Sequence, residues 1–289
     1  MDEDEVKGSR APRGETGDIV KQRFKVTAEQ KAFANTFGFL VLRGAFSVAE
    51  TKQIDDAFEQ VMTKEMRNQG MTRDQQLEHR FVICPGFCER HSALRALTKD
   101  DRILQTLEMM LGSDWFYKDS EGNLYVGPTD WHPDGGWAPS TPLWPSDPNT
   151  EPHHLLTYVK VAVYPDSLTA DSGCLRVIPG SHRSPFHESL ASLHMDIPIE
   201  APEMATDLRF KRFGIDPSDV PSFAIETQPS DIVFFFGHTW HSAFGGKAGR
   251  RNIAMSYFSV PKNEGQRKWA QGIKGRAARI AQEQISNQS

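Results

Sequence analysis

The sequence predicts a mainly β protein in which a jelly roll or barrel of antiparallel strands has α-helices packed outside it. Two observations lead to this prediction. Helical patterns occupy the first hundred or so residues, and from about residue 115 they give way to short extended apolar runs. Pro, Gly, Asp and Ser separate these runs, as is usual between short strands. Helices followed by a series of strands favour helices at the outside of an antiparallel core.

The helices are predicted from their ends. Two segments have a capping box, in which a Ser or Thr is followed three residues later by Glu or Gln. The first box, Thr27 with Gln30, opens a helix that should end at Gly38. A buried strand is expected over 38–44. The second box, Ser47 with Glu50, opens a helix to about residue 67, and a further helix is expected over about 101–111.

One domain over residues 23–289 is the simplest organisation, because neither an internal repeat nor a linker divides the chain. Residues 1–22 mix acids, bases, Gly and Pro without apolar periodicity and are expected to be a disordered tail. The jelly-roll core is expected over about 115–260 and a final helix over about 263–284. The expected strands lie in NLYVGPTDWH, LLTYVKVAVY, GCLRVIPGSH, SFAIETQ, DIVFFFGHTWH and RNIAMSYFSV.

Composition excludes several classes. The net charge of -5 argues against a nucleic-acid-binding surface, and no apolar run approaches the roughly 20 residues of a membrane span. The N-terminus has no apolar signal region, so a cytoplasmic protein is expected. Three cysteines cannot form a disulfide framework, and Cys84 and Cys88 have no second pair with which to complete a zinc site. They are interpreted as ordinary thiols.

The segment TDWHPDGGW contains the residues most suggestive of chemistry. His132 and Asp134 are two residues apart at the end of an expected strand, where alternate side chains share one face. HTWHSAFGG offers His238 or His241 as a third ligand. Two His and one carboxylate on one face of an iron ion leave three positions open, which a bidentate 2-oxo acid and O2 can fill. An isolated HxD is weak evidence, and a loop histidine bonded to a carboxylate is the simpler explanation.

Arginines soon after the second histidine strengthen the hypothesis. Arg250 and Arg251 follow within ten residues, and a guanidinium can bind the distal carboxylate of 2-oxoglutarate through two parallel bonds. Arg251 shares strand parity with an apolar row, Ile253, Met255 and Tyr257, which is expected to face inward. Arg251 is therefore preferred over Arg250 as the cosubstrate ligand.

Lys160 is a charge within the otherwise apolar strand TYVKVAVY, on the same face as Tyr158. Either this is an edge strand with Lys160 in water, or Lys160 lies near the cosubstrate or an acidic substrate, with Tyr158 beside it. The Pro-rich stretch after Asp134 carries Trp137 and Trp144. A loop of this length is usually a lid or a binding loop, so it is expected to close over the substrate.

The chain resembles the phytanoyl-CoA dioxygenase family of Fe(II)/2-oxoglutarate oxygenases. The similar segments, which follow the family's order between about residues 27 and 260, are TAEQKAFANTFGFLVLRGAFS, WHPDGGW, DSGCLRVIPGSHR and SDIVFFFGHTWHSAFGGKAGRRNIAMSYF.

The resemblance implies a double-stranded β-helix core with Fe(II), 2-oxoglutarate and O2 as cofactor and cosubstrates. It implies His132 and Asp134 as the first two iron ligands. The Trp240-His241-Ser242 setting fits the family's third ligand, which leaves His238 with a structural role. Arg251 lies ten residues after His241, one short of the commonest spacing in the family.

The expected reaction is hydroxylation of an unactivated C–H bond in a small molecule, with release of succinate and CO2. Desaturation, epimerisation or ring formation with the same cofactors is the first alternative. Two alternatives of other classes are a cupin-type metal enzyme that needs no 2-oxo acid and a jelly roll that binds small molecules without turnover. The cupin would lack the arginine, and the binding protein would have lost a ligand.

Overall fold

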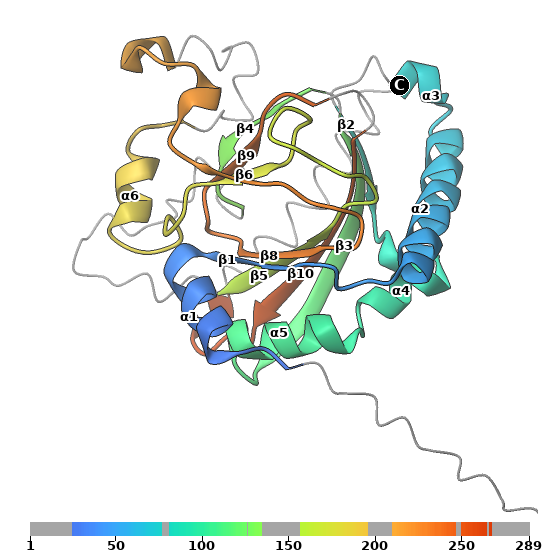
Figure 1. Cartoon of the computed structure of the whole chain (residues 1–289), viewed down its shortest axis with the longest axis horizontal. Coiled ribbons are helices and arrows are strands. Elements are labelled where there is room, and N and C mark those ends of the chain that lie inside the picture. The colour runs from blue at the N-terminus through green and yellow to red at the C-terminus, as the bar shows by residue number, and fades with distance from the viewer. Residues whose placement is uncertain are drawn as a thin grey trace, which may run out of the picture.

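Two antiparallel sheets face one another, with helices around the larger one (Figure 1). The computed structural model describes residues 25–76, 81–125, 127–134, 157–195, 210–246, 250–264 and 266–267. The predicted tail over 1–22, the loop with Trp137 and Trp144, and most of the predicted helix over 263–284 lie outside these residues. The arrangement confirms the predicted jelly roll with flanking helices.

The larger sheet has six strands in the order β1-β8-β5-β10-β3-β2, and the smaller has four in the order β4-β9-β6-β7. Strands that are distant in sequence are neighbours in both sheets, as in a jelly roll. The bounds of the larger sheet are β1 Phe39–Leu42, β2 Phe81–Pro85, β3 Trp115–Tyr125, β5 Tyr158–Val163, β8 Ile232–Phe236 and β10 Arg250–Ser259. Those of the smaller sheet are β4 Thr129–His132, β6 Leu175–Val177, β7 Phe223–Ile225 and β9 His241–Ala243.

Helices cover the outer face of the larger sheet, along its lower and right sides in Figure 1. They are α1 Ala28–Phe37, α2 Val48–Asn68, α3 Arg73–Gln76, α4 Ser92–Leu97 and α5 Asp101–Leu111. Phe58 and Met62 of α2 are fully buried against this face. Each such side chain stabilises the fold by roughly 1.5–3 kcal/mol. On the far side of the small sheet lies α6 Phe186–Ala191, and the short 3-10 turns are η1 Cys88–Arg90, η2 Lys211–Phe213 and η3 Pro217–Asp219.

The predicted helix starts are confirmed in detail. The Thr27 side chain accepts a hydrogen bond from the Gln30 backbone while the Gln30 side chain accepts one from Thr27, and Ser47 and Glu50 make the same reciprocal pair. Gly38 ends α1 in the left-handed conformation. The sequence did not predict β2 or α4, which are short. Because β1 and β2 join the larger sheet, its strands extend beyond the expected core of 115–260.

Both faces of the larger sheet are buried. In β8, Phe234 lies in the outer core with the helices, whereas Val233 and Phe235 lie in an inner core between the two sheets. This explains why DIVFFF is apolar without alternation. The inner core is completed from the small sheet by Leu175, Val177 and Ile225.

The outer face of the small sheet carries a third apolar cluster, built around Trp131 and Trp240 with Leu190 of α6.

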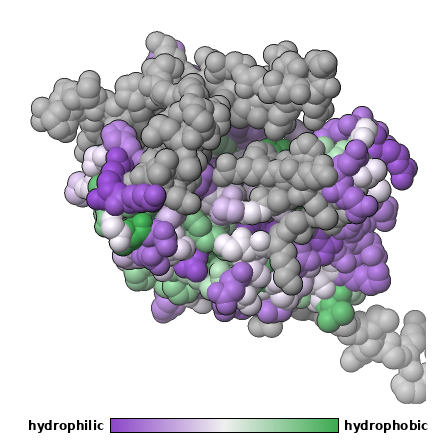
Figure 2. Space-filling view, turned by 90° about the horizontal axis from the view of Figure 1, so that it is seen from above, coloured by the Kyte–Doolittle hydropathy of each residue, from purple (hydrophilic) through white to green (hydrophobic). Residues whose placement is uncertain are grey.

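Hydrophilic side chains predominate among the coloured residues at the right of Figure 2, the side on which α2 lies. Within the described ranges no helix is long and apolar enough to cross a membrane.

Ser47→Ala should lower the free energy of unfolding by about 1 kcal/mol, because the first turn of α2 loses its side-chain acceptor. Urea unfolding followed by circular dichroism measures this change. Ser47→Asp, which retains an acceptor at the same position, is the control and should stay close to the unmodified protein. Equal losses in both variants would show that the cap contributes little.

Candidate metal centre

Two histidines meet because β4 pairs with β9. In this antiparallel pair His132 is the direct partner of His241, although more than a hundred residues separate them in sequence. Their ring centroids are 4.3 Å apart. The pairing of the two strands therefore creates the first half of a possible metal site.

The same dipeptide, Trp-His, occurs at the end of β4 and at the start of β9, where Trp240 directly precedes the strand. Adjacent side chains of a strand point to opposite faces. Trp131 and Trp240 are therefore buried in the cluster outside the small sheet, and the histidine that follows each points inward. The Trp131 indole donates a hydrogen bond to the Pro217 carbonyl at 2.8 Å, which fixes the outer side of β4.

Asp134 completes the group from the turn after β4. Its backbone N–H donates to the Gly237 carbonyl at 2.8 Å, which holds the turn against the end of β8. Asp134 Oδ1 lies 3.9 Å from His132 Nε2, and Oδ2 lies 3.8 Å from His241 Nε2. One potential ligand atom from each of the three residues lies within 4.8 Å of the others. The structure thus brings together the three residues that the sequence predicted as iron ligands.

Backbone carbonyls orient both imidazoles. His132 Nδ1 lies 2.7 Å from the Asp130 carbonyl, and His241 Nδ1 lies 2.8 Å from the Thr239 carbonyl. Because a carbonyl only accepts, each Nδ1 must carry the proton in the neutral ring, which leaves Nε2 with a lone pair. Hydrogen bonding of the remote ring nitrogen is the usual support of a metal-binding histidine.

Burial and charge set the protonation of the site. Burial, with help from His132, lowers the pKa of His241 to about 4, so this imidazole is neutral at neutral pH. Burial alone would raise the pKa of Asp134, but the Lys160 ammonium and the two histidines outweigh it and lower the pKa to about 2. A neutral imidazole beside an ionised carboxylate is the state that a metal ion requires.

The donor set fits a metal ion. Asp134 Oδ2 is buried, and the Lys160 ammonium lies 3.4 Å away, farther than a short charge-assisted hydrogen bond. The oxygen therefore keeps lone pairs that could bind a metal ion. With two unprotonated Nε2 atoms close by, this oxygen is placed as a ligand of a shared ion would be. Two His and one carboxylate are typical of non-haem iron sites with open positions.

Lys160 lies inside the barrel, next to this group. β5 is a central strand between β8 and β10, so the alternative of an edge strand in water is wrong. The Lys160 ammonium is 3.4 Å from Asp134 Oδ2 and 3.1 Å from Glu121 Oε1, and its side chain is 19% exposed. Burial opposes the charge, yet the carboxylates of Asp134 and Glu121 raise the pKa of Lys160 well above its usual range.

Tyr158 also faces inward, because it lies two residues before Lys160 on the same face of β5. Its ring stacks on Phe258 with 4.6 Å between centroids and packs against Gly237. A Cβ at Gly237 would come within 1.8 Å of the Tyr158 ring, so only glycine fits here. The Gly237 carbonyl also accepts the hydrogen bond from the Asp134 backbone, so Tyr158 packs against the residue that holds Asp134.

Arg250 is a buried cation on the inward face of β10. Its Nη1 donates to the Gly173 carbonyl at 2.6 Å, and its guanidinium lies over the Tyr125 ring at 4.8 Å. Burial lowers the pKa of Arg250. Within the described ranges no ion pair joins Arg250 to a carboxylate. Arg250 lies over Tyr125 and Lys160 pairs with Glu121, and these two residues share one face of β3, so both cations face one interior region.

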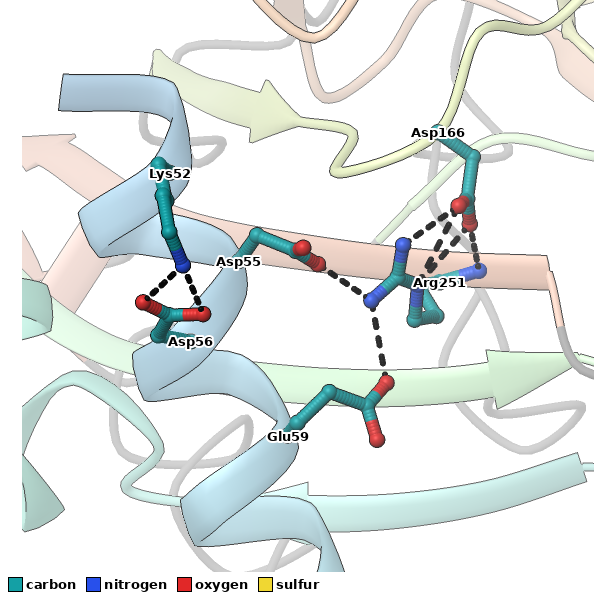
Figure 3. A network of polar contacts seen from close by, with 6 residues as sticks. All are labelled: Lys52, Asp55, Asp56, Glu59, Asp166 and Arg251. Atoms are coloured by element: carbon teal, nitrogen blue, oxygen red, sulfur yellow. Dashed lines mark hydrogen bonds and ion pairs between the residues drawn. The ribbon is translucent and has the colours of Figure 1, made fainter. Parts of the chain in front are cut away.

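Arg251, the arginine preferred from the sequence, points the other way (Figure 3). Its guanidinium faces α2 and binds Asp55, Glu59 and Asp166, at 2.5, 2.9 and 2.5 Å respectively. Its backbone N–H also donates to Asp166 at 3.3 Å. Arg251 therefore ties α2, the start of β10 and the segment after β5 together, and the prediction that it faces inward was wrong.

The reason lies in the two buried faces of the sheet. Arg251 does share a face with Ile253, Met255 and Tyr257, but that apolar face packs under the helices. The inward face of β10 is the more polar one, with Arg250, Asn252 and Ser256. An apolar row marks the barrel interior only where the other face of the sheet is in water.

The remaining site residues are placed as follows. His238 lies outside the three-residue group, with its ring edge-on to Tyr158 at 5.2 Å and its carbonyl bonded to His187. The sequence reading missed Glu121, the acidic partner of Lys160. Its signal was the alternation of Glu121, Asn123 and Tyr125 along one face of β3, which marks a polar inner wall.

The fold and site define a jelly-roll protein with two histidines and a carboxylate that can hold a metal ion. The chain belongs to the phytanoyl-CoA dioxygenase (PhyH) family, whose sequence model matches residues 34–252. No curated protein matches the sequence.

Several solved structures share the fold. The non-haem α-ketoglutarate-dependent carbocyclase SnoK from nogalamycin biosynthesis has a TM-score of 0.56 at 17% identity, and the match covers 81% of this chain and 84% of SnoK. HygX from Streptomyces hygroscopicus with iron bound has a TM-score of 0.55 at 16% identity, over 82% and 88% of the two chains. EctD from S. alaskensis with 2-oxoglutarate and 5-hydroxyectoine has a TM-score of 0.55 at 21% identity, over 81% and 77%.

Arg251→Met should lower the free energy of unfolding by about 1–2 kcal/mol, because three partly exposed carboxylates lose the cation that they share. Lys52→Met is the matched control, because Lys52 lies on α2, the helix that Arg251 contacts. Lys52 and Asp56 form an exposed pair, drawn beside Arg251 in Figure 3, and its loss should change stability by less than about 0.5 kcal/mol. Urea unfolding of both variants measures the difference. Equal effects would contradict a structural role for Arg251.

Proposed function

We propose that this protein is an Fe(II)- and 2-oxoglutarate-dependent dioxygenase that hydroxylates an unactivated C–H bond of a small molecule and releases succinate and CO2. The observation that carries the proposal is the inward-facing group of His132, Asp134 and His241, in which carbonyls fix both imidazoles with Nε2 available. Membership of the phytanoyl-CoA dioxygenase family supports it. So do the solved structures of the same fold that contain iron or 2-oxoglutarate.

The three residues would hold the metal with different functions. His132 and His241 offer neutral Nε2 donors whose direction is set by the Asp130 and Thr239 carbonyls. Asp134 offers an anionic oxygen and is held in place by Gly237. A three-residue set leaves coordination positions for a 2-oxo acid and O2, and these, bound with iron, would supply the oxidation of the substrate.

Arg250 replaces Arg251 as the proposed ligand of the distal carboxylate of 2-oxoglutarate. It is a buried guanidinium on the inward face, and the described part of the chain gives it a carbonyl partner and an aromatic face but no carboxylate. A buried cation without an anion is costly, so an incoming carboxylate would stabilise it. Lys160 is a second inward cation, close to Asp134, whereas Tyr158 is proposed to position Gly237 and, through it, Asp134.

A substrate screen tests the reaction. The protein is incubated with Fe(II), 2-oxoglutarate, O2 and candidate small molecules, and succinate is measured alongside the mass of each candidate. A gain of one oxygen atom coupled to succinate supports hydroxylation. Loss of two hydrogens, or an isomer of unchanged mass, would assign desaturation, ring formation or epimerisation instead.

His132→Ala, Asp134→Ala and His241→Ala should each abolish succinate formation and weaken Ni(II) binding, measured by calorimetry, by at least about 10-fold. Each removes one of the three proposed protein ligands. His238→Ala is the control and should bind Ni(II) as the unmodified protein does. Loss of binding in His238→Ala with normal binding in His241→Ala would reverse the assignment.

Arg250→Gln should weaken 2-oxoglutarate binding to the Ni(II)-loaded protein by about 2 kcal/mol or more while Ni(II) affinity changes little. The physical reason is loss of a buried charge-assisted bond. Arg251→Gln is the neighbouring control and should lose stability without a comparable loss of 2-oxoglutarate affinity. The opposite result in these two variants would restore Arg251 as the cosubstrate ligand.

A further inference from the structure

Lys160 is a cation inside the barrel that is not one of the three proposed metal ligands. Lys160 projects from β5, where its register partners are Ser256 of β10 and Phe235 of β8. Its ammonium lies 3.4 Å from Asp134 Oδ2, an oxygen of one of the three proposed metal ligands. It also lies 3.1 Å from Glu121.

A divalent ion held by Asp134 would therefore lie close to a fixed positive charge. The three potential ligand atoms fall within 4.8 Å of one another, and Lys160 contacts one of the three residues directly. Like charges at such distances repel, so Lys160 opposes the binding of a metal ion alone. For a dianion the sign is reversed, and Lys160 attracts it.

Four described charged groups, which lie in or beside the proposed site, balance one another. Asp134 and Glu121 carry one negative charge each, and Lys160 and Arg250 one positive charge each. A metal dication alone would add two positive charges to these four described groups. A metal dication together with a dicarboxylate dianion restores neutrality, and burial of net charge is costly.

We propose that Lys160 shifts binding free energy from the metal ion to the dianionic cosubstrate, so that the metal is held weakly until the 2-oxo acid is present. This inference rests on the proposed function and adds a role to Lys160 that metal ligation and carboxylate binding by Arg250 do not include. Lys160 is a positioning residue in this scheme, acting through charge on both ligands. A purely structural lysine, which only neutralises Asp134 and Glu121, would favour both ligands or neither.

Ni(II) is the probe for the test, because it is stable in air and a HygX structure of the same fold contains nickel with 2-oxoglutarate. Calorimetry measures Ni(II) binding to the metal-free protein, then 2-oxoglutarate binding to the Ni(II)-loaded protein. In Lys160→Met we expect Ni(II) to bind about 10-fold tighter and 2-oxoglutarate about 10-fold weaker. The product of the two binding constants should change much less than either constant.

Two further variants make the test independent of any folding defect in Lys160→Met. Lys160→Arg keeps the charge and should keep both affinities within about threefold of the unmodified protein. Glu121→Gln removes the negative charge on the other side of Lys160. It should shift both affinities in the reverse direction, with weaker Ni(II) and tighter 2-oxoglutarate binding. Thermal unfolding of each variant verifies that the compared proteins are folded.

The outcomes separate the inference from the function on which it rests. Opposite shifts of the two affinities in Lys160→Met, reversed in Glu121→Gln, support the inference. Parallel losses of both affinities, or unchanged affinities in both variants, overturn it while the metal site stands. If the unmodified protein binds neither Ni(II) nor 2-oxoglutarate, the proposed function itself fails.

Discussion

The pairing of β4 with β9 is the constraint on which the metal centre depends. The hydrogen-bonded register places His132 opposite His241, and the alternation of the strands sends both histidines inward while Trp131 and Trp240 point outward. A shift of one residue in this register would exchange the histidines with the tryptophans. Burial of the two tryptophans outside the small sheet therefore stabilises the arrangement of the ligands inside it.

The interior of the barrel holds fixed charges beside its hydrophobic inner core. On the larger sheet the apolar side chains under the helices stabilise the fold, and the inner face carries Glu121, Lys160 and Arg250 beside the turn with Asp134. These groups are held by strands with two neighbours each, so their positions are set by backbone hydrogen bonds and not by flexible loops. Fixed charges of this kind favour ligands of complementary charge without rearrangement of the protein.

The two adjacent arginines of β10 have different roles, one in the barrel interior and one in attaching the helical layer. Arg250 turns inward to a carbonyl and an aromatic ring, and Arg251 turns outward to three carboxylates that join α2 to the sheet. Their neighbours in sequence are nearly the same, yet one faces the proposed cosubstrate and the other secures the helical layer. Any loss of Arg251 acts on the framework that holds Arg250 in place.

The sequence by itself determined the fold class, the capped starts of α1 and α2 and the identity of the three potential ligands, because each follows from local spacing or from motifs in chain order. Only the tertiary structure decided which arginine faces inward and that Lys160 contacts both Asp134 and Glu121. Strand parity says which residues share a face, but not what covers that face. In a sheet buried on both sides, an apolar row is equally consistent with the barrel interior and with the layer under the helices, so only the packing of the helices distinguishes them.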